Sequence, residues 1–391
     1  MTPRFIRSSI AIAASTYMLL ALGIFSVTGA VHAASVPDGS LLAKQQNLPR
    51  WWYVSKPSPK AVALYERAPS EAEQSVVDKA NAMLASGELR AFAMLEGDKV
   101  VHSGFSGPAN PDSLFYGYSM GKTITGMATG QAICAGKMEL TSKAGDVIPE
   151  LAGTDLGEST VHDLLRMASG TRMNNNHPSL ILPSQESELI LKKSSFFDLM
   201  MDSAVTSAHK SVFGNKRKPG DAFEYKGTEP MTLGVMIAKA TSMPFSQWMQ
   251  EQVYDPMGAA KTGNFLEDPQ RIGMTSGGSR LRFEDWLRFA VWVKKSSKAP
   301  GCLGDFVRAS MTKQIKNDPL KQRRAGYYYD SYGYLMWTEN TIAPNTAWAV
   351  GLGGQLIGWN LSSDRIIVAF SNDDSSSAKV YAMSKEWNAI K

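Results

Sequence analysis

The stretch of sequence that decides the fold is Tyr116-Gly117-Tyr118-Ser119-Met120-Gly121-Lys122-Thr123. It contains a Ser-x-x-Lys tetrad, and a spacing of three residues places Ser119 and Lys122 on one face of a helix, roughly 5–6 Å apart at Cβ. A hydroxyl is a weak nucleophile until a base takes its proton, and a lysine one helical turn further along can be that base. The tetrad therefore predicts a serine nucleophile paired with a lysine, an arrangement that requires neither a histidine nor a metal.

The same tetrad recurs at Ser207 to Lys210, Ser310 to Lys313 and Ser376 to Lys379, so the spacing alone is weak evidence. Most single occurrences of Ser-x-x-Lys are an exposed pair of residues on a helix. Only Ser119 is followed by small and apolar residues, from Gly121 to Ile133, a pattern typical of a helix that is buried on most sides. The context therefore favours Ser119 over the three other serines.

A competing interpretation takes Gly117 to Gly121 as the Gly-x-Ser-x-Gly nucleophile elbow of α/β-hydrolases. That pattern requires a strand directly before the serine and a triad histidine late in the chain. The residues Leu114 to Tyr118 leave room for only a short strand, and no histidine follows His209. A Ser-His-Asp triad needs its histidine, so the sequence disfavours the elbow.

Residues 1–33 have the pattern of a secretory signal, with Arg4 and Arg7 ahead of an apolar core and Val31-His32-Ala33 at the expected cleavage site. Polar residues interrupt the apolar core, which favours removal of the segment over a permanent membrane span. No cysteine lies near the cleavage site, which argues against a lipid anchor. We expect an exported protein, periplasmic if the host has an outer membrane, with no stable membrane anchor after the signal is removed.

Charge and cysteine content limit the other classes of function. The formal net charge of +5 falls to +3 without the two arginines of the signal, too little to indicate nucleic acid or a membrane surface as a partner. The five histidines are scattered and show no metal-ligand spacing, so no metal or other cofactor is expected. Cys134 and Cys302 are the only cysteines. Export would permit a disulfide between them, but two buried free thiols are the favoured expectation.

The order of predicted elements indicates an α+β fold. An N-terminal arm at 34–68 holds too many prolines for regular structure, and its aromatic trio at 51–53 is expected to pin it to the body. A helix at 69–85 and a hairpin at 89–103 follow, and strands return near the C-terminus at 333–338, 347–360 and 365–372. Helices are expected at 160–165, 195–207, 231–241, 246–253, 284–295 and 377–390. We therefore predict one domain at 69–391, with a sheet lobe at about 69–118 and 300–391 and a helical lobe at about 119–299.

Two further segments are candidates for the site. Tyr225 follows the Pro219-Gly220 turn, and near ammonium groups a tyrosine can lose its proton below the reference pKa of ~10. A half-buried structural tyrosine is the alternative. Three glycines interrupt the apolar stretch Trp348 to Ile357, where glycine often marks the close approach of a ligand or of another backbone. The amide of Leu352 could point at a substrate carbonyl oxygen; a bulge or tight packing is the alternative.

Together these stretches resemble the penicillin-recognising serine hydrolases, which include class C β-lactamases, DD-peptidases, related esterases and the 6-aminohexanoate-dimer hydrolases. The resemblance covers most of the chain from Pro69 onward. Its motifs, in order, include the Ser119 tetrad, Val161 to Gly170, Pro219 to Tyr225, Tyr254 to Gly258 and Ser276-Gly277-Gly278. It implies an antiparallel sheet built from both chain ends and flanked by helices, plus a helical lobe.

The resemblance also implies roles for individual residues. Ser119 would be the nucleophile, Lys122 and Tyr225 would handle protons, and the amides of Ser119 and Leu352 would form the oxyanion hole. Gly351, Gly353 and Gly354 would lie along the bound substrate.

The sequence departs from the β-lactamase pattern at two places. Tyr225-Lys226-Gly227 lacks the asparagine that β-lactamases carry two residues after the tyrosine, and Gly351-Leu352-Gly353 stands where they have Lys-Thr-Gly. A literal Lys261-Thr262-Gly263 is interpreted as an unrelated match, because the residues after it do not look like a core strand. The stretch Gly351 to Gln355 looks closer to the 6-aminohexanoate-dimer hydrolase and esterase branch. We therefore expect hydrolysis of a small-molecule ester or linear amide through an acyl-enzyme at Ser119.

Two alternatives remain open: β-lactamase or DD-peptidase activity, and a non-catalytic binding or sensor protein on the same fold. The sequence does not identify the substrate, the oligomeric state or the residue that lowers the pKa of Lys122. For the last of these, a second cation is expected beside Lys122. Lys226 is a candidate, and a Lys226 side chain that points outward is the alternative.

Overall fold

The main sheet joins the two ends of the chain. In the computed structural model, the described residues are 52–171, 195–197, 201, 217–268, 270–317 and 327–390. Nine strands lie in the order β2-β4-β3-β13-β12-β11-β10-β9-β8, and neighbouring strands are antiparallel except for the parallel pair β2 and β4 at one edge. The predicted sheet from both termini is confirmed, with that parallel edge as an addition. The strands are β2 (Tyr65–Glu66), β3 (Leu89–Glu96), β4 (Lys99–Phe105), β8 (Ile315–Lys316), β9 (Tyr329–Tyr332), β10 (Trp337–Asn340), β11 (Thr346–Gly351), β12 (Gln355–Asn360) and β13 (Arg365–Ser371).

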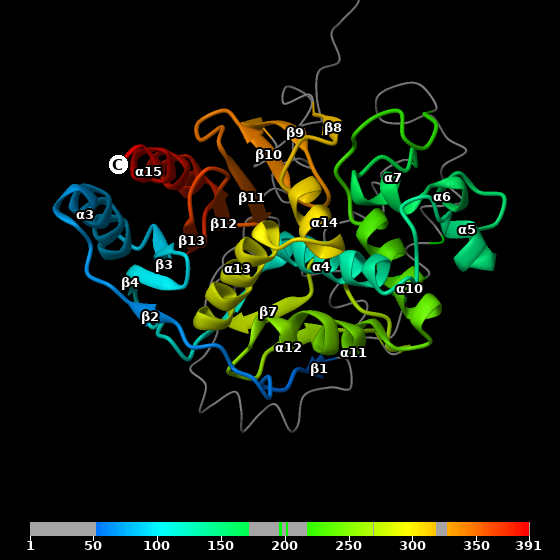
Figure 1. Cartoon of the computed structure of the whole chain (residues 1–391), viewed down its shortest axis with the longest axis horizontal. Coiled ribbons are helices and arrows are strands. Elements are labelled where there is room, and N and C mark those ends of the chain that lie inside the picture. Colours follow the sequence, from blue (N-terminus) through cyan, green and yellow to red (C-terminus); the bar gives the residue numbers. More distant parts are fainter. Residues whose placement is uncertain are drawn as a thin grey trace, which may run out of the picture.

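Helices cover both faces of this sheet (Figure 1). Helices α3 (Glu71–Ala85) and α15 (Ser377–Ala389), both predicted as helices from the sequence, pack together against one face. Helix α13 (Phe283–Lys298) packs against β12 and β13 from the other side. Its amphipathic pattern predicted the helix, but its place on the main sheet differs from the helical lobe to which we assigned it.

Helix α3 begins where the sequence indicates. The Ser70 amide donates to Glu73 Oε2 at 2.8 Å, which closes a capping box at the first turn. The buried Glu73 carboxylate also accepts from Trp387 Nε1 at 3.0 Å and from Arg67. One carboxylate thus ties α3 to α15 and to the segment before it.

A second, smaller sheet was not predicted. It has the order β1-β6-β7-β5, formed by β1 (Trp52–Val54), β6 (Asn264–Leu266), β7 (Ser279–Arg282) and β5 (Leu114–Tyr116). The arm therefore does contain regular structure, because β1 pairs with β6, and Arg280 stacks over Trp52 at 4.3 Å. The residues after Lys261-Thr262-Gly263 also form a buried strand, contrary to our expectation.

Most helices from the middle of the chain lie below and to the right of the main sheet in Figure 1. Helix α4 (Gly121–Cys134) runs through the centre and contacts α10 (Thr228–Thr241), α14 (Cys302–Ser310) and β11. The predicted helix cap at Thr160 is confirmed, since its hydroxyl accepts from the Asp163 amide at 3.1 Å. The others are α5 (Ala144–Val147), η2 (Pro149–Leu151), α6 (Asp155–Glu158), α7 (Val161–Leu165), α11 (Phe245–Met249), the π-helical η3 (Gln250–Tyr254), α12 (Asp255–Met257) and η6 (Asp374–Ser376).

Two strand predictions near the C-terminus are wrong in detail. The expected single strand at 347–360 is a hairpin, with β11 and β12 joined by Leu352-Gly353-Gly354. Gly353 and Gly354 have φ values of 80° and 81°, a backbone region that glycine enters without steric cost, so the chain reverses there. The strand predicted at 333–338 begins only at Trp337 and continues to Asn340.

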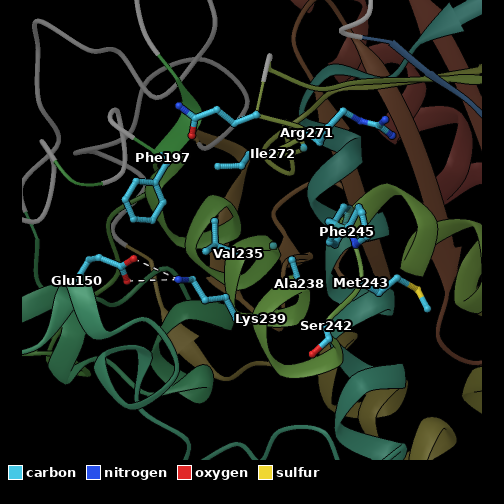
Figure 2. A pocket seen from close by; sticks show the side chains of 14 residues that line it. Glu150, Phe197, Val235, Ala238, Lys239, Ser242, Met243, Phe245, Arg271 and Ile272 are labelled. Carbon is cyan, nitrogen blue, oxygen red and sulfur yellow. Dashed lines mark hydrogen bonds and ion pairs between the residues drawn. The ribbon is translucent and has the colours of Figure 1, made fainter.

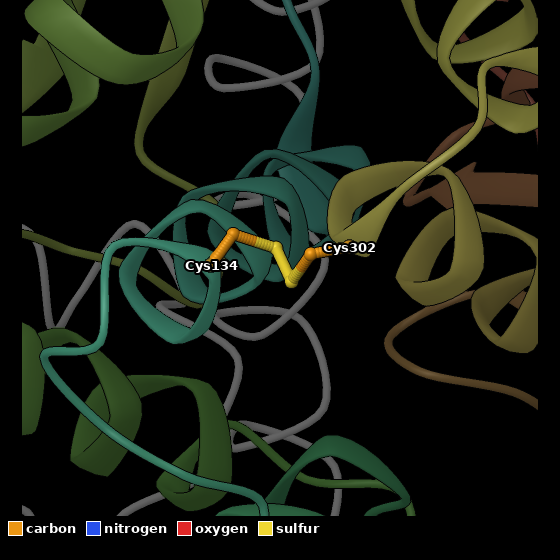
Figure 3. The surroundings of a disulfide bond; sticks show 2 residues. All are labelled: Cys134 and Cys302. Atoms are coloured by element: carbon orange, nitrogen blue, oxygen red, sulfur yellow. A yellow bond between two sulfur atoms is a disulfide. The ribbon is translucent and has the colours of Figure 1, made fainter.

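The favoured expectation of two free thiols is also wrong. Cys134 and Cys302 form a disulfide with a Cα–Cα distance of 5.6 Å (Figure 3). The bond joins the last residue of α4 to the first residue of α14, two helices that pack side by side. A separation of 168 residues gave no indication of this proximity in the sequence.

Three predicted segments fall outside the described residues: the signal at 1–33, residues 34–51 of the arm, and most of the helix at 195–207. Within the described ranges, none of the helices is both long and apolar enough to cross a membrane.

Candidate active site

Ser119 lies at the start of the central helix. Strand β5 ends at Tyr116, the 3₁₀ turn η1 (Tyr118–Met120) follows, and α4 begins at Gly121. Tyr118 has a φ of 47°, a conformation that costs energy in a residue with a side chain and that is often found beside functional groups. The turn presents Ser119 ahead of a helix N-terminus, where free amide groups and the helix dipole favour negative charge.

A short strand thus does precede the serine, as the nucleophile-elbow pattern requires. The histidines of the described residues do not complete a triad. His102 packs near Phe92 in the main sheet, and His162 packs against Tyr334. The amine-bearing side chain of Lys122 lies beside Ser119 instead.

Lys122 is buried and lies directly against Ser119. Its Nζ atom is 3.0 Å from Ser119 Oγ and donates to the carbonyl oxygen of Ser276 at 2.8 Å. The side chain is only 1 % exposed, and this burial lowers the pKa of Lys122 to about 7, although the Glu229 carboxylate acts to raise it. Near neutral pH a large share of Lys122 is therefore uncharged.

The hydrogen bond to Ser276 orients the lysine for proton transfer. A neutral amine has two N–H groups and one lone pair, whereas an ammonium group has three donors and no acceptor. With one N–H committed to the Ser276 carbonyl, the lone pair can accept the proton of Ser119 Oγ. The motif Ser276-Gly277-Gly278 was part of the family resemblance, but its sequence gave no signal for this role of the Ser276 carbonyl.

Tyr225 completes a three-residue cluster. Its hydroxyl is hydrogen-bonded to Ser119, and Lys122 Nζ lies 4.9 Å from the centre of its ring. The ring packs against Trp337 at 5.0 Å and Tyr332 at 6.2 Å between centroids. The structure thus brings together all three side chains that the sequence singled out.

The protonation of Tyr225 differs from our expectation. Burial raises the pKa of Tyr225 above 10, and the hydrogen bond with Ser119 offsets only part of this effect. The phenol therefore stays protonated at neutral pH. Tyr225 is therefore well placed to donate a proton, and its raised pKa disfavours a role as a phenolate base.

The second cation expected beside Lys122 is paired elsewhere. Lys226 points inward rather than outward, and its Nζ lies 2.8 Å from Glu229 Oε1 in a fully buried ion pair. Burial alone accounts for the lowered pKa of Lys122, because the Glu229 carboxylate acts in the opposite direction. Sequence reasoning did not identify Glu229.

The hairpin of β11 and β12 approaches Ser119 from the side of the main sheet. A Cβ atom on Gly351 would stand 2.2 Å from the Gly117 carbonyl oxygen, so the absence of a side chain lets β11 contact η1. Leu352 follows directly in the turn. The amides of Gly353 and Gly354 both donate to Asp374 Oδ1, at 2.6 and 3.0 Å. Asp374 therefore fixes the turn beside the candidate oxyanion hole.

The other described Ser-x-x-Lys tetrads and the literal Lys-Thr-Gly have residues that are bonded elsewhere in the structure. Ser310 Oγ donates to the Phe306 carbonyl, and Lys313 pairs with Glu339. Lys379 pairs with Glu88. Lys261 is half exposed and lies 3.8 Å from Asp112, three residues before β6. The tetrad at 207–210 lies outside the described residues.

A cavity of about 470 Å³ lies apart from this cluster, along α10 (Figure 2). Its apolar wall includes Phe197, Val235 and Ile272, and the ion pair of Lys239 with Glu150 lies at its rim. None of Ser119, Lys122 and Tyr225 lines it. Across the described ranges, no three His, Cys, Asp or Glu side chains are grouped to hold a metal ion.

Comparisons with known proteins identify the family and the fold. The family model named Beta-lactamase matches residues 89–385. The 6-aminohexanoate-dimer hydrolase of Paenarthrobacter ureafaciens is 19 % identical over 289 residues, which is 72 % of each chain.

Solved structures share the fold. A putative 6-aminohexanoate-dimer hydrolase from Bacillus anthracis superimposes with a TM-score of 0.65 at 16 % identity, covering 86 % of this chain and 89 % of that one. A β-lactamase/D-alanine carboxypeptidase from Pseudomonas syringae gives 0.58 at 15 % identity, covering 82 % and 100 %. The hydrolase EstCE1, described as having promiscuous acyltransferase activity, gives 0.60 at 13 %, covering 81 % and 100 %.

The fold and the family match define a serine hydrolase with a penicillin-binding-like architecture. The chain belongs to the β-lactamase family, since the family model spans well over half of its length. The predicted family and fold class are thereby confirmed.

Proposed function

We propose that this protein hydrolyses a small-molecule ester or linear amide through an acyl-enzyme on Ser119. The observation that supports the proposal best is the buried Lys122 amine, 3.0 Å from Ser119 Oγ and with a pKa lowered to about 7. A base is most effective when its pKa lies near the working pH, and positioned proton transfer contributes roughly 10²–10⁴ in rate.

In the proposed acylation, Lys122 accepts the proton of Ser119 Oγ while this oxygen bonds to the acyl carbon. The amides of Ser119 and Leu352 stabilise the resulting oxyanion, and one such donor is worth about 10²–10³ in rate at other acyl-transfer sites. The bond to the leaving group then breaks as Tyr225 donates its proton. Lys122 has gained one proton and Tyr225 has lost one, so a transfer between them restores both. Water cleaves the acyl-enzyme and returns Ser119.

The substrate class rests on the hairpin beside Ser119. Gly351-Leu352-Gly353 supplies no cation at the place where β-lactamases carry a lysine that helps to hold the substrate carboxylate. Lys261, in the literal Lys-Thr-Gly, lies three residues before β6 and faces Asp112 at 3.8 Å, so it does not stand at the position of the hairpin motif. The similarity to the Paenarthrobacter ureafaciens 6-aminohexanoate-dimer hydrolase supports a linear amide.

We also propose that the protein is exported. The pattern of residues 1–33 is that of a secretory signal, and disulfides such as Cys134–Cys302 persist mainly in oxidising compartments. Detection of the mature chain in the periplasmic or extracellular fraction, beginning near Ala34, would test this. Recovery of the uncut chain in the cytoplasm would contradict it.

A fluorophosphonate probe tests the nucleophile directly. We expect labelling of the wild type and of Ser310→Ala, but none of Ser119→Ala. Labelling that survives Ser119→Ala would reject the assignment. A panel of p-nitrophenyl esters, linear amides and nitrocefin then separates the substrate classes. Turnover of nitrocefin in preference to the others would favour a β-lactamase, and an unlabelled, inactive wild type would favour a binding protein.

A further inference from the structure

Lys226 and Glu229 form a buried ion pair next to Tyr225 that takes part in no step of the proposed reaction. Lys226 and Glu229 are 1 % and 0 % exposed at their side chains, and their charged atoms are 2.8 Å apart. Removing two charges from water has a large desolvation free energy. Their mutual attraction offsets this free energy only in a favourable geometry. Stability alone therefore gives little reason for a lysine and a glutamate at these positions.

Glu229 also connects the two segments that flank the site. Its Oε1 atom accepts a hydrogen bond from Ser169 Oγ at 2.6 Å, and Ser169 Oγ lies 2.8 Å from Thr171 Oγ1. Ser169 follows α7, whereas Glu229 lies in the first turn of α10. The carboxylate thus fixes the segment after α7 to the start of α10.

The loop that carries Tyr225 is held on both sides of the tyrosine. On one side, the Glu224 amide donates to the Met167 carbonyl at 2.9 Å. On the other side, Lys226 is anchored to Glu229. Both anchors lead to the same segment, Met167 to Thr171. A tyrosine between two such anchors has little freedom to leave its hydrogen bond with Ser119.

The elements around Lys122 contribute few other charges. The neighbouring β11, η1, α11 and the stretch 274–278 contain no charged residue. In α14, Asp305 and Arg308 pair with each other at the surface, and in η3 the Glu251 carboxylate accepts from Gln247 on the exposed side. Asp163 and Arg166 of α7 form their own pair. Of the described carboxylates, Glu229 is the one that acts on Lys122 electrostatically.

We propose that Lys226 and Glu229 are positioning residues for the Ser119 site. Their ion pair anchors the loop that carries Tyr225, and the Lys226 cation compensates the negative charge of Glu229 that acts on Lys122. This inference rests on the proposed function, because it assigns Lys122 as the base. It predicts that removing either charge alone disturbs Lys122 in opposite directions. Glu229→Gln leaves an uncompensated cation near Lys122, which favours the neutral amine, and Lys226→Met leaves an uncompensated anion, which favours the ammonium form.

The test is the pH dependence of the rate at which a fluorophosphonate probe labels Ser119, a reaction that needs no known substrate. We expect the acid limb of the profile to move by about one pH unit to lower pH in Glu229→Gln, and to higher pH in Lys226→Met. The control variants Glu150→Gln and Lys239→Met break a half-exposed pair between η2 and the far end of α10 and should leave the limb in place. A purely structural pair would slow labelling in both single variants without opposite shifts, which would overturn the inference.

Single variants that leave one buried charge risk poor folding, so the double variant Lys226→Met/Glu229→Leu provides a second test. Replacing a buried pair by apolar residues of similar size is often neutral for stability. We expect a folded protein that is labelled about tenfold more slowly, with its acid limb between those of the two single variants. Full wild-type labelling would reject the positioning role. An unlabelled wild type would instead reject the proposed function itself.

Discussion

Lys122 Nζ lies 3.0 Å from Ser119 Oγ, and the pKa of this buried lysine is lowered from 10.5 to about 7. The base must be neutral to accept the serine proton, so activity should depend on the fraction of Lys122 that has lost its proton. We predict that the rate of probe labelling, and of ester hydrolysis, rises about tenfold per pH unit up to pH 7 and then levels off. A rate independent of pH between 5 and 8 would contradict Lys122 as the base.

Replacing the lysine tests the same relationship without reliance on pH. Lys122→Met keeps the length of the side chain in a buried site but removes the proton acceptor. We expect acylation to fall by about 10²–10⁴, while the melting temperature stays near that of the wild type. The matched control is Lys313→Met in the Ser310 tetrad, where the lysine pairs with Glu339 at the surface. Equal loss in both variants would indicate a general effect on the fold.

Tyr225→Phe removes one hydroxyl and leaves the ring against Trp337. Because burial raises the pKa of Tyr225, this residue should act as a proton donor to the leaving group. We predict a loss of about 10²–10³ in kcat for substrates with poor leaving groups, and a smaller loss for p-nitrophenyl esters, whose leaving group needs no proton. Kinetics on a matched pair of alkyl and p-nitrophenyl esters measures the difference. Identical losses on both would exclude this role. The exposed Tyr327→Phe is the control.

The sequence predicted the helices with strong patterns, because capping residues and apolar periodicity act locally. The Ser70 capping box and the amphipathic face of α13 are examples. It also predicted the cluster of Ser119, Lys122 and Tyr225, through one helical spacing and a family resemblance. The helices depend on residues close in sequence, and the cluster was recognised from motifs that follow one another in the same order as in the family.

Other features depend on contacts between distant residues, and no local pattern encodes them. The small sheet consists of strands of three or four residues that come from opposite parts of the chain. Gly353 and Gly354 form a turn, whereas the sequence predicted them inside one strand. Their positive φ values, which the sequence does not show, distinguish a turn from a strand. The inward direction of Lys226 is explained by Glu229, a partner that has no recognisable motif.

Gly351→Ala tests whether the hairpin must approach the serine closely. The added Cβ would stand 2.2 Å from the Gly117 carbonyl oxygen and 2.9 Å from Gln355 Cβ, so the backbone must move. We predict a stability loss of about 1–3 kcal/mol from overpacking. Acylation should fall about 10²-fold, because a shift near 1 Å misplaces the Leu352 amide. The control Gly136→Ala adds a methyl group in open space, and although its φ of 68° makes an alanine there cost stability, acylation by the folded protein should be unaffected. Unchanged acylation in Gly351→Ala would remove this hairpin from the site.

The disulfide should contribute to stability and not to catalysis. It closes a loop across 168 residues, so Cys134→Ser/Cys302→Ser should lower the free energy of unfolding by about 2–4 kcal/mol. Cys134 lies 12 residues beyond Lys122 on α4, a distance of about 18 Å along the helix axis, so the rate of Ser119 labelling should stay the same. Thermal melts with and without dithiothreitol measure the effect. The reductant should lower the melting temperature of the wild type towards that of the double variant and should not affect the double variant. If the double variant instead loses labelling at temperatures where it is folded, the bond has a role in holding α4 and its lysine in place.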